Sequence, residues 1–284
     1  MILLKMLQSY YMSNFWKRTI SGILFVAVIL WALWAGPISF SLLFAAITAL
    51  TLHEFLNLCG ISPKSPLRPI AIAAGVVVFI FHFLLAGNFI EFHQLIGLLA
   101  LPFILTAVAT FARSHQPVSD LVYALAALIY PATFMGAINY LVYQPPEATA
   151  FNSMLVIGIF LLIWSYDTFA YLTGKWLGRH KLMPRLSPGK SWEGSAGGLM
   201  MSLLVALLLH LWIGRLDLLS WLLVSVIAAV AGTVGDLFES MLKRSANVKD
   251  SGSLIPGHGG MLDRLDAALF VFPAILLYLQ IASL

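Results

Sequence analysis

Residues 216–238, LDLLSWLLVSVIAAVAGTVGDLF, decide the fold. The two acidic residues of this stretch, Asp217 and Asp236, lie near its ends, and no charged residue lies between them. Crossing the apolar core of a bilayer takes roughly 20 consecutive apolar residues in an α-helix. The stretch therefore predicts a membrane-spanning helix with a carboxylate near its second end.

The whole chain has the same apolar character. Of its 284 residues, 61% are hydrophobic and 10% are charged, whereas soluble domains average roughly 45–50% and 25%. The mean hydropathy is +0.94. Such a chain lacks the polar surface of a soluble domain and is too apolar to be disordered. A single cysteine excludes both a disulfide framework and a cysteine-based zinc site. The composition predicts an all-α, polytopic transmembrane helical bundle.

Nine apolar stretches are long enough to span a bilayer. They lie near residues 19–36, 38–59, 69–87, 94–112, 119–143, 151–173, 194–213, 216–238 and 265–283. We divide the chain into 1–150, with spans one to five, and a catalytic membrane region, 151–284, with spans six to nine. The second region holds two long loops, 174–193 and 239–264. The first apolar stretch is too long for a cleavable signal, so we expect a retained span.

The basic residues support nine spans because they segregate to one side of the membrane. One side receives fifteen of them and the other only Arg215. The fifteen are Lys5, Lys17, Arg18, Lys64, Arg68, Arg113, Lys175, Arg179, Lys181, Arg185, Lys190, Lys243, Arg244, Lys249 and Arg264. Cytoplasmic loops carry such an excess of Lys and Arg. We therefore expect the N-terminus and both long loops in the cytoplasm.

Four aspartates are candidates for a functional centre. Asp167 lies within span six, about seven residues or ~10 Å below the loop, and intramembrane carboxylates usually serve function. The alternative is a hydrogen bond to a neighbouring helix. Asp236 closes span eight, and Asp263 and Asp266 share a face at the start of span nine. Clustered carboxylates repel one another unless a cation or protons neutralise their charge. Hard oxygen ligands of this kind indicate Mg²⁺. Helix capping is the alternative for the pair.

Both long loops combine basic residues with glycine. One runs through Lys243, Arg244 and Lys249 to Gly257-His258-Gly259-Gly260, and such a composition suits a polyphosphate. The alternative is a flexible interfacial loop whose cations extend to the water.

The other loop has Lys175 and then Ser187-Pro-Gly-Lys190-Ser191. Pro184 stands where a Walker A motif needs glycine, so that match fails. A turn, a lysine and a hydroxyl before a helix N-terminus still suit a phosphate.

Other polar residues have simpler interpretations. His82 and His210 on apolar spans are expected to be packed or interfacial residues and not ligands, and Cys59 is expected to be a small packing residue. Glu91, Glu147 and Asp217 are expected to be solvated loop charges on the far side. Glu54, near the cytoplasmic end of span two, is a further candidate for the site. Aromatic residues near the span ends are typical of interface anchors and do not indicate nucleic-acid binding.

Residues 240–266, SMLKRSANVKDSGSLIPGHGGMLDRLD, resemble the phosphatidate cytidylyltransferase signature throughout their 27 positions. The loop 175–194 is also similar to that family, so the detailed resemblance covers about 164–266. One departure is Thr168-Phe169 after Asp167, where the family often has small residues. This puts direct substrate contact at Thr168-Phe169 in doubt, but not the carboxylate.

The resemblance implies that CTP and phosphatidic acid give CDP-diacylglycerol and pyrophosphate. It also implies Mg²⁺, with K⁺ as a candidate second cation, and a homodimer in the bacterial inner membrane. By matching positions, Asp236, Asp263 and Asp266 are the predicted catalytic metal ligands, with Asp167 contributing and Lys249 catalytic. The predicted substrate-binding residues are Lys175, Ser187, Lys190, Ser191, Lys243, Arg244, His258, Gly259, Gly260 and Arg264.

Two other functions remain open at this point. A CTP-dependent lipid kinase would use similar charged loops but would transfer the γ-phosphoryl group. An ion-coupled transporter would also bury Asp167 and Asp236, but it would not need two basic, glycine-containing loops on one side.

Overall fold

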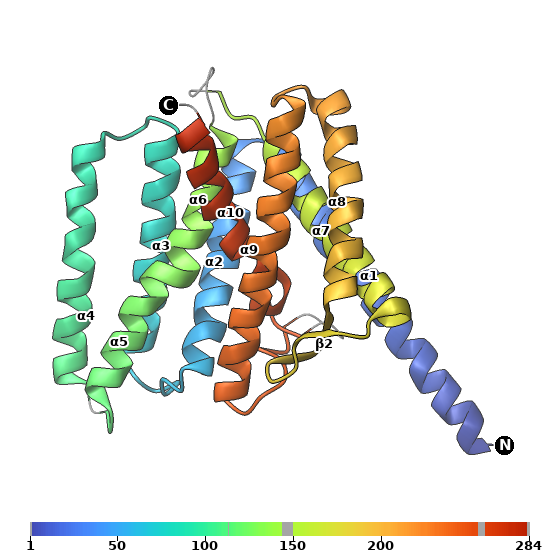
Figure 1. The fold of residues 1–284 in the computed structure, drawn as a ribbon. Helices are drawn as coiled ribbons and strands as arrows, with labels where there is room; N and C mark the ends of the chain where they lie inside the picture. Colours follow the sequence, from blue (N-terminus) through green and yellow to red (C-terminus); the bar gives the residue numbers. More distant parts are fainter. Residues whose placement is uncertain (1, 113, 144–149, 255–258, 283–284) are drawn as a thin grey trace.

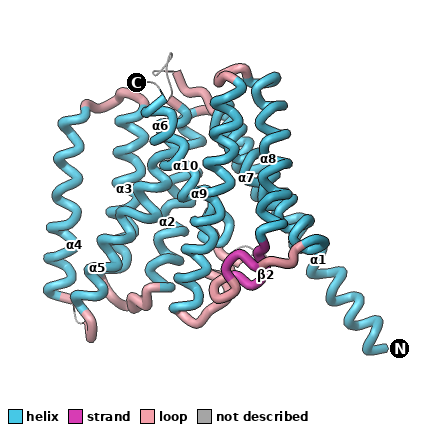
Figure 2. The backbone as a smooth tube through the Cα atoms, viewed as in Figure 1, coloured by secondary structure: helices cyan, strands magenta, loops and turns pink. Residues whose placement is uncertain are grey.

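The computed structural model describes residues 2–112, 114–143, 150–254 and 259–282, with side chains from residue 19 onward. Its elements are helices apart from one small hairpin, as Figure 2 shows. The first helices are α1 (Ile2–Ala35), α2 (Pro37–Leu58), α3 (Leu67–Ala86), η1 (Phe92–Leu99), α4 (Ala100–Phe111), α5 (Pro117–Ala127), η2 (Leu128–Thr133) and α6 (Phe134–Val142). The later elements are α7 (Met154–Leu177), β1 (Lys181–Met183), β2 (Ser187–Ser191), α8 (Trp192–Ile213), α9 (Leu218–Ser245) and α10 (Leu262–Ala282).

The prediction of a polytopic helical bundle is confirmed. Within the described residues, eight helical segments are long and apolar enough to cross a membrane, and a ninth, Thr19–Ala35, is apolar but shorter. Each predicted span coincides with one of these nine segments. The fifth span is continuous through α5, η2 and α6, and η2 is a π-helical turn that contains Pro131. Proline lacks the N–H that an α-helix would use there, which accounts for the irregular turn.

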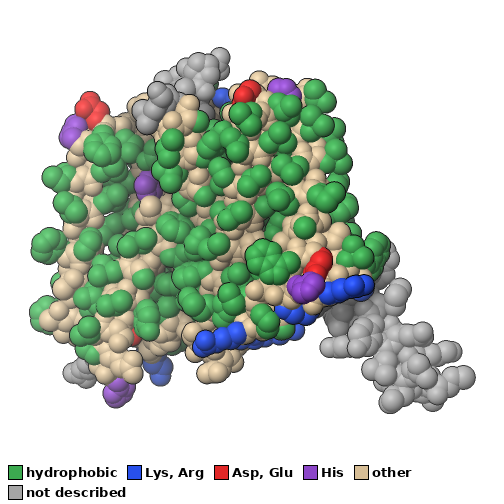
Figure 3. All heavy atoms as spheres, in the orientation of Figure 1, with side chains coloured by type: hydrophobic (Ala, Val, Ile, Leu, Met, Phe, Trp, Pro, Cys, Tyr) green, Lys and Arg blue, Asp and Glu red, His purple; other side chains and the backbone are tan. Residues whose placement is uncertain are grey.

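The outside of the bundle is apolar and the basic residues gather at one end. Large side chains such as Phe103 and Phe111 are 79% and 87% exposed. Figure 3 shows hydrophobic side chains over the flank of the visible face and Lys and Arg in a band at the end that carries the hairpin. Such a flank suits hydrocarbon, with the charged groups at a membrane surface. Of the predicted basic side, Lys5, Lys17, Arg18 and Arg113 have side chains outside the described residues.

Both long loops are shorter than predicted. Helix α7 continues to Leu177, and β1 pairs antiparallel with β2 in the register Lys181 to Ser191 and Met183 to Ser187. Helix α9 continues to Ser245. Hydropathy marks where charges begin, but helical hydrogen bonding continues beyond that point. Lys243 and Arg244 in the last turn of α9 also complement the negative end of the helix dipole. The loop interpretation was therefore wrong for the hairpin and for the helical residues 174–177, 192–193, 239–245 and 262–264.

Helices of both predicted regions share one core. Helix α10 packs against α9 and also against α6 and α2. Fully buried aromatic side chains come from both halves and include Phe40, Phe79, Phe160 and Trp221. The division of the chain at residue 150 stays a prediction. Helix α10 packs against helices from both of the predicted regions.

Helices α7 and α8 approach each other closely through glycine. A Cβ at Gly198 would lie 2.7 Å from the backbone oxygen of Tyr166, and one at Gly194 would lie 2.7 Å from that of Ala170. Small residues allow such backbone contact between membrane helices. This contact fixes α8, and the hairpin before it, against the part of α7 that carries Asp167.

We expect Gly198→Val to destabilise the protein by about 1–3 kcal/mol, because the added side chain must push α8 away from α7. Thermal unfolding in detergent measures the change. Gly97→Ala is the control, since nothing lies within 4 Å of a Cβ at Gly97. Equal melting temperatures for the two variants would contradict the close packing.

Candidate active site

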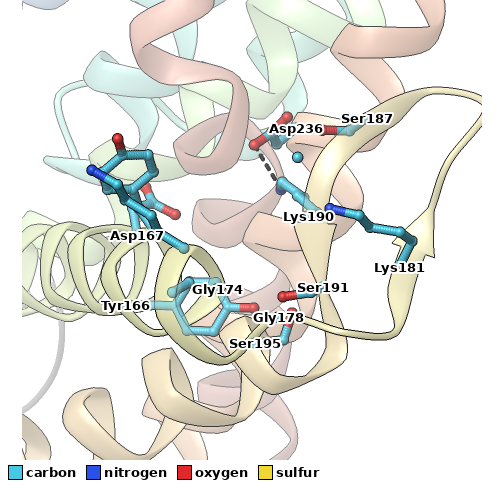
Figure 4. A pocket seen from close by; sticks show the side chains of 14 residues that line it. Tyr166, Asp167, Gly174, Gly178, Lys181, Ser187, Lys190, Ser191, Ser195 and Asp236 are labelled. Atoms are coloured by element: carbon cyan, nitrogen blue, oxygen red, sulfur yellow. Dashed lines mark ion pairs between the residues drawn. The ribbon is translucent and has the colours of Figure 1, made fainter.

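A cavity of about 610 Å³ lies between the hairpin, α7 and α9. Helix α7 contributes Asp167 and Lys175 to its wall, α9 contributes Asp236, and the hairpin contributes Lys181 and Lys190. The hydroxyl-bearing residues Ser187, Ser191, Ser195, Tyr166 and Tyr171 also line it; Figure 4 labels the three serines and Tyr166. Since α7 ends at Leu177, the cavity reaches roughly 15 Å along that helix to Asp167. The cavity therefore joins a basic surface loop to an acid within a membrane helix.

An ion pair joins the hairpin to α9 inside this cavity. Lys190 Nζ lies 2.6 Å from Asp236 Oδ2, and the two side chains are 24% and 34% exposed. Figure 4 shows Lys190 reaching from the hairpin to Asp236, with Lys181 and Ser187 on the same hairpin. Partly solvated pairs contribute little net stability. Lys190 thus remains available to an anionic ligand at small cost.

Three carboxylates from three helices face this region. Asp266 of α10 is close enough to Asp236 and Asp167 for their negative charges to repel one another. Lys190 and Arg264 are near enough to Asp167 to offset part of that charge. We call Asp167, Asp236 and Asp266 the acidic group. Its charge is incompletely balanced by side chains of the described residues, so it favours a cation.

Asp263 belongs to a second cluster, beside the acidic group. Its Oδ1 accepts a hydrogen bond from Lys243 Nζ at 2.7 Å, and Lys243 also pairs with the buried Glu239 at 2.5 Å. Its Oδ2 accepts hydrogen bonds from the backbone N–H groups of Ser251 and Gly260 at 2.9 and 2.7 Å. We call Glu54, Glu239, Lys243, Ser251 and Asp263 the buried network. Both oxygens of Asp263 are engaged there.

Glu54 completes the buried network from α2. Its carboxylate accepts hydrogen bonds from the backbone N–H groups of Met261 and Leu262 at 2.9 and 2.8 Å, and from Ser251 Oγ at 2.9 Å. The side chain is only 5% exposed. Sequence analysis identified Glu54 only as a candidate, from its position near the end of a span, because its partners are about two hundred residues away in the chain.

The structure divides the predicted site residues into groups. The cavity and the acidic group bring together Asp167, Asp236, Asp266, Lys175, Ser187, Lys190 and Ser191. Lys243, Asp263 and Gly260 lie in or against the buried network, where Lys243 is held by two carboxylates. Gly259 lies beside Asp263 with φ +82°, a conformation that favours glycine. Arg244, Lys249 and Arg264 are exposed, and His258 lies outside the described residues.

The N-terminus of α8, predicted as a phosphate site, has first-turn N–H groups that are already hydrogen-bonded within the protein. Ser191 is the N-cap, and its Oγ accepts a hydrogen bond from the Gly194 N–H at 3.2 Å. The Trp192 N–H donates to the backbone oxygen of His180. These first-turn donors are already bound, so the lysine side chains are the better groups for a phosphate. Sequence reasoning also missed Lys181 as a cavity residue, because only the hairpin places it opposite Ser191.

The surroundings of His82, His210 and Cys59 agree with their simpler interpretations. His82 Nδ1 lies 3.0 Å from the Tyr140 hydroxyl, and His210 Nδ1 lies 3.1 Å from the backbone oxygen of Leu216. Burial raises the pKa of the Cys59 thiol to about 11. Cys59 is therefore protonated near neutral pH and behaves as a small packing residue.

Among the described residues, no three His, Cys, Asp or Glu side chains are close enough to hold one metal ion together. Mg²⁺, however, is commonly bound by one or two carboxylates, with substrate phosphates and water as its other ligands. The oxygen donors of Asp236 and Asp266, beside a cavity lined by lysines, match that pattern. The residues present thus fit Mg²⁺ bound together with a polyphosphate.

Comparison with known proteins gives one consistent result. Residues 16–282 match the model of the Cytidylyltransferase family. A phosphatidate cytidylyltransferase of Staphylococcus aureus (strain COL) is 35% identical over 261 residues, covering 90% of this chain and 95% of that protein. Phosphatidate cytidylyltransferases of Haemophilus influenzae and Staphylococcus epidermidis (strain RP62A) are each 32% identical over 90% of this chain, and 96% and 95% of those proteins are covered.

Proposed function

This chain belongs to the cytidylyltransferase family, and we propose that its hairpin cavity and acidic group form the site that transfers CMP from CTP to phosphatidic acid. The products are CDP-diacylglycerol and pyrophosphate, as a step of phospholipid biosynthesis. The reaction is assigned to this cavity because of where the cavity lies. It joins three lysines to two acids of the acidic group at the basic end of a membrane bundle.

The reaction needs little proton chemistry. A phosphate oxygen of phosphatidate attacks the α-phosphorus of CTP, a new P–O bond forms, and the bond from that phosphorus to the bridging oxygen breaks. Pyrophosphate leaves with the electron pair. The phosphatidate oxygen is already ionised, so no strong base is required. The barrier lies in bringing two polyanions together, which positioning and positive charge reduce.

The lysines of the cavity supply that positive charge. Lys190 is held by Asp236 at 2.6 Å in a partly exposed pair, and a triphosphate offers it a stronger, charge-assisted set of acceptors. Lys175 and Lys181 line the same cavity. Arg244, Lys249 and Arg264 of the 240–266 segment are exposed and are proposed to contact the phosphates of the two substrates.

Asp236 and Asp266, with Asp167, are the proposed ligands of Mg²⁺. When bound, the ion would neutralise charge on the phosphates and the leaving group. Asp263 could bind the ion only if it gave up its hydrogen bond to Lys243 or those to its backbone donors. K⁺ remains a proposed second cation, and activity measured with and without K⁺ at fixed ionic strength tests it.

We expect Asp263→Asn to lower activity mainly at limiting Mg²⁺ if Asp263 is a ligand. If it only anchors the buried network, the loss would be the same at every Mg²⁺ concentration. The measurement is a Mg²⁺ titration of initial rates. Near-normal activity at limiting Mg²⁺ would contradict the ligand assignment.

The function is tested with purified protein in detergent–phosphatidate micelles with Mg²⁺, using CTP labelled at the α- or the γ-phosphate. The proposal requires α-label in the lipid and γ-label in pyrophosphate. Entry of γ-label into a lipid would instead indicate a kinase. If neither label moved in folded protein, ion-coupled transport would be the alternative to test.

We also propose that the N-terminus and the hairpin end face the cytoplasm of a bacterial inner membrane and that the protein is a homodimer. The supporting observation for the first is the band of Lys and Arg at the hairpin end. Labelling of single cysteines placed at Lys64 and at Asn152 in intact cells, in a Cys59→Ala background, tests the orientation. The mass of the detergent-solubilised protein tests the dimer.

A further inference from the structure

We propose that Glu54 is a positioning residue that holds the start of α10, and with it Asp263 and Asp266, in place for the reaction. The inference rests on the proposed function. Glu54 lies in α2, in the half of the chain outside the signature region, and no substrate-facing role is needed for it.

The contacts of Glu54 are those of a helix cap supplied from a distant part of the chain. The first N–H groups of a helix have no partner within it and need an acceptor. Glu54 Oε1 accepts from the Met261 N–H at 2.9 Å, and Oε2 accepts from the Leu262 N–H at 2.8 Å. Leu262 is the first residue of α10. A carboxylate at this end also interacts favourably with the helix dipole.

The same carboxylate is connected to Asp263 through Ser251. Ser251 Oγ lies 2.9 Å from Glu54 Oε2 and 3.0 Å from Asp263 Oδ2, so its single hydrogen is within reach of both. Asp263 in turn binds Lys243, which pairs with Glu239 of α9. The cap therefore ties α2 to α9 and α10, two of the three helices that carry acids of the proposed site.

The surroundings leave no room for Glu54 to shift. A Cβ at Gly252 would lie 2.6 Å from Glu54 Oε1, and a Cβ at Gly260 would also clash with the carboxylate. These two glycines let the loop backbone close around a carboxylate that is 5% exposed. Glu54 forms no ion pair within the described part of the chain, and its three hydrogen-bond donors stabilise its charge.

The substitution Glu54→Gln tests whether the carboxylate of Glu54 holds the start of α10 and whether that position affects the reaction. Glutamine keeps the size but has one acceptor oxygen and an NH₂ group that would face N–H donors. We expect amide hydrogen exchange of the segment around Met261 and Leu262 to become at least about tenfold faster, as for one lost buried hydrogen bond. The value of kcat should fall by about 10–100-fold, as for an outer partner of a metal ligand. KM for CTP should stay within about threefold, because the hairpin is not attached to Glu54.

The experiment uses the full chain in detergent, with Glu91→Gln as matched control. Glu91 is 82% exposed, and its variant should match the wild type in exchange and kinetics. Glu54→Asp keeps the charge and should restore part of both properties, a rescue that loss of fold would not give. If Glu54→Gln does not yield folded protein, Glu54→Asp and Ser251→Ala replace it, and each should speed exchange and lower kcat.

Two results would overturn the proposal. Unchanged exchange around Met261 in Glu54→Gln would show that the cap does not hold this segment. Faster exchange with kcat within about twofold of wild type would show that its position does not affect the chemistry. If the wild type itself transfers no CMP, the proposed function fails, while the exchange comparison still decides whether Glu54 holds α10.

Discussion

Asp236→Asn is expected to lower kcat by about 10³-fold, more than the 10–100-fold typical of residues that only support a metal ligand. Asp236, like Asp167, lines the cavity and belongs to the acidic group, and it also pairs with Lys190. An amide at this position keeps the size but cannot neutralise a cation or the lysine. Initial rates with saturating CTP, measured across a Mg²⁺ titration, give the result.

The control for this variant is on the same helix. Asp217 is the N-cap of α9, where its side chain accepts from the Ser220 N–H at 3.0 Å. Asn caps a helix about as well as Asp, so Asp217→Asn should leave both rate and stability nearly unchanged. If Asp236 served only to hold Lys190, the double variant Asp236→Asn/Lys190→Met would be no worse than either single variant at any Mg²⁺ concentration, and the metal assignment would fail.

Lys190→Met is expected to lower kcat/KM for CTP by about 10²-fold, the effect of removing one charge-assisted contact to the developing charge. Methionine keeps the length of the side chain but loses the ammonium group. The loss should appear in kcat as well as in KM, because the lysine is proposed to stabilise the leaving pyrophosphate. Steady-state kinetics at several CTP concentrations separate the two.

Lys64→Met is the control for Lys190→Met. Lys64 is an exposed lysine at the same end of the bundle but lines a different cavity, so only nonspecific attraction of CTP would be lost. Equal losses for the two variants would mean that the basic surface acts only by its overall charge, and Lys190 would then have no specific role.

Most of the membrane architecture could be predicted because it depends on local sequence. The span 216–238 is apolar over its length, and every such stretch must satisfy its backbone hydrogen bonds as a helix. Errors came at the ends, as in α9, which runs on to Ser245. The hairpin was missed because Ser187–Ser191 has the composition of a turn and is a strand only by pairing with Lys181–Met183.

The sequence shows which acids are candidates for the site, but not which of them lie in the acidic group and which in the buried network. Asp263 and Asp266 are three residues apart, yet Asp263 is bound by Lys243 and Ser251, while Asp266 faces Asp236 and Asp167. Helical spacing places two side chains on one face but says nothing of which neighbours approach them. The same holds for Lys243. Its proximity to Glu239 could be predicted from helical spacing, whereas its ion pair with Asp263 on another helix could not.

The sequence by itself determined that this protein is a helical membrane protein, which end of the bundle is basic, and which aspartates to examine, because hydropathy and charge act residue by residue. Only the tertiary structure decided that Lys190 meets Asp236, that Asp263 lies in a separate network, and that Glu54 caps α10. Those contacts join residues far apart in the chain. They depend on how closely α2, α7, α9 and α10 pack, and packing is a property of the whole bundle.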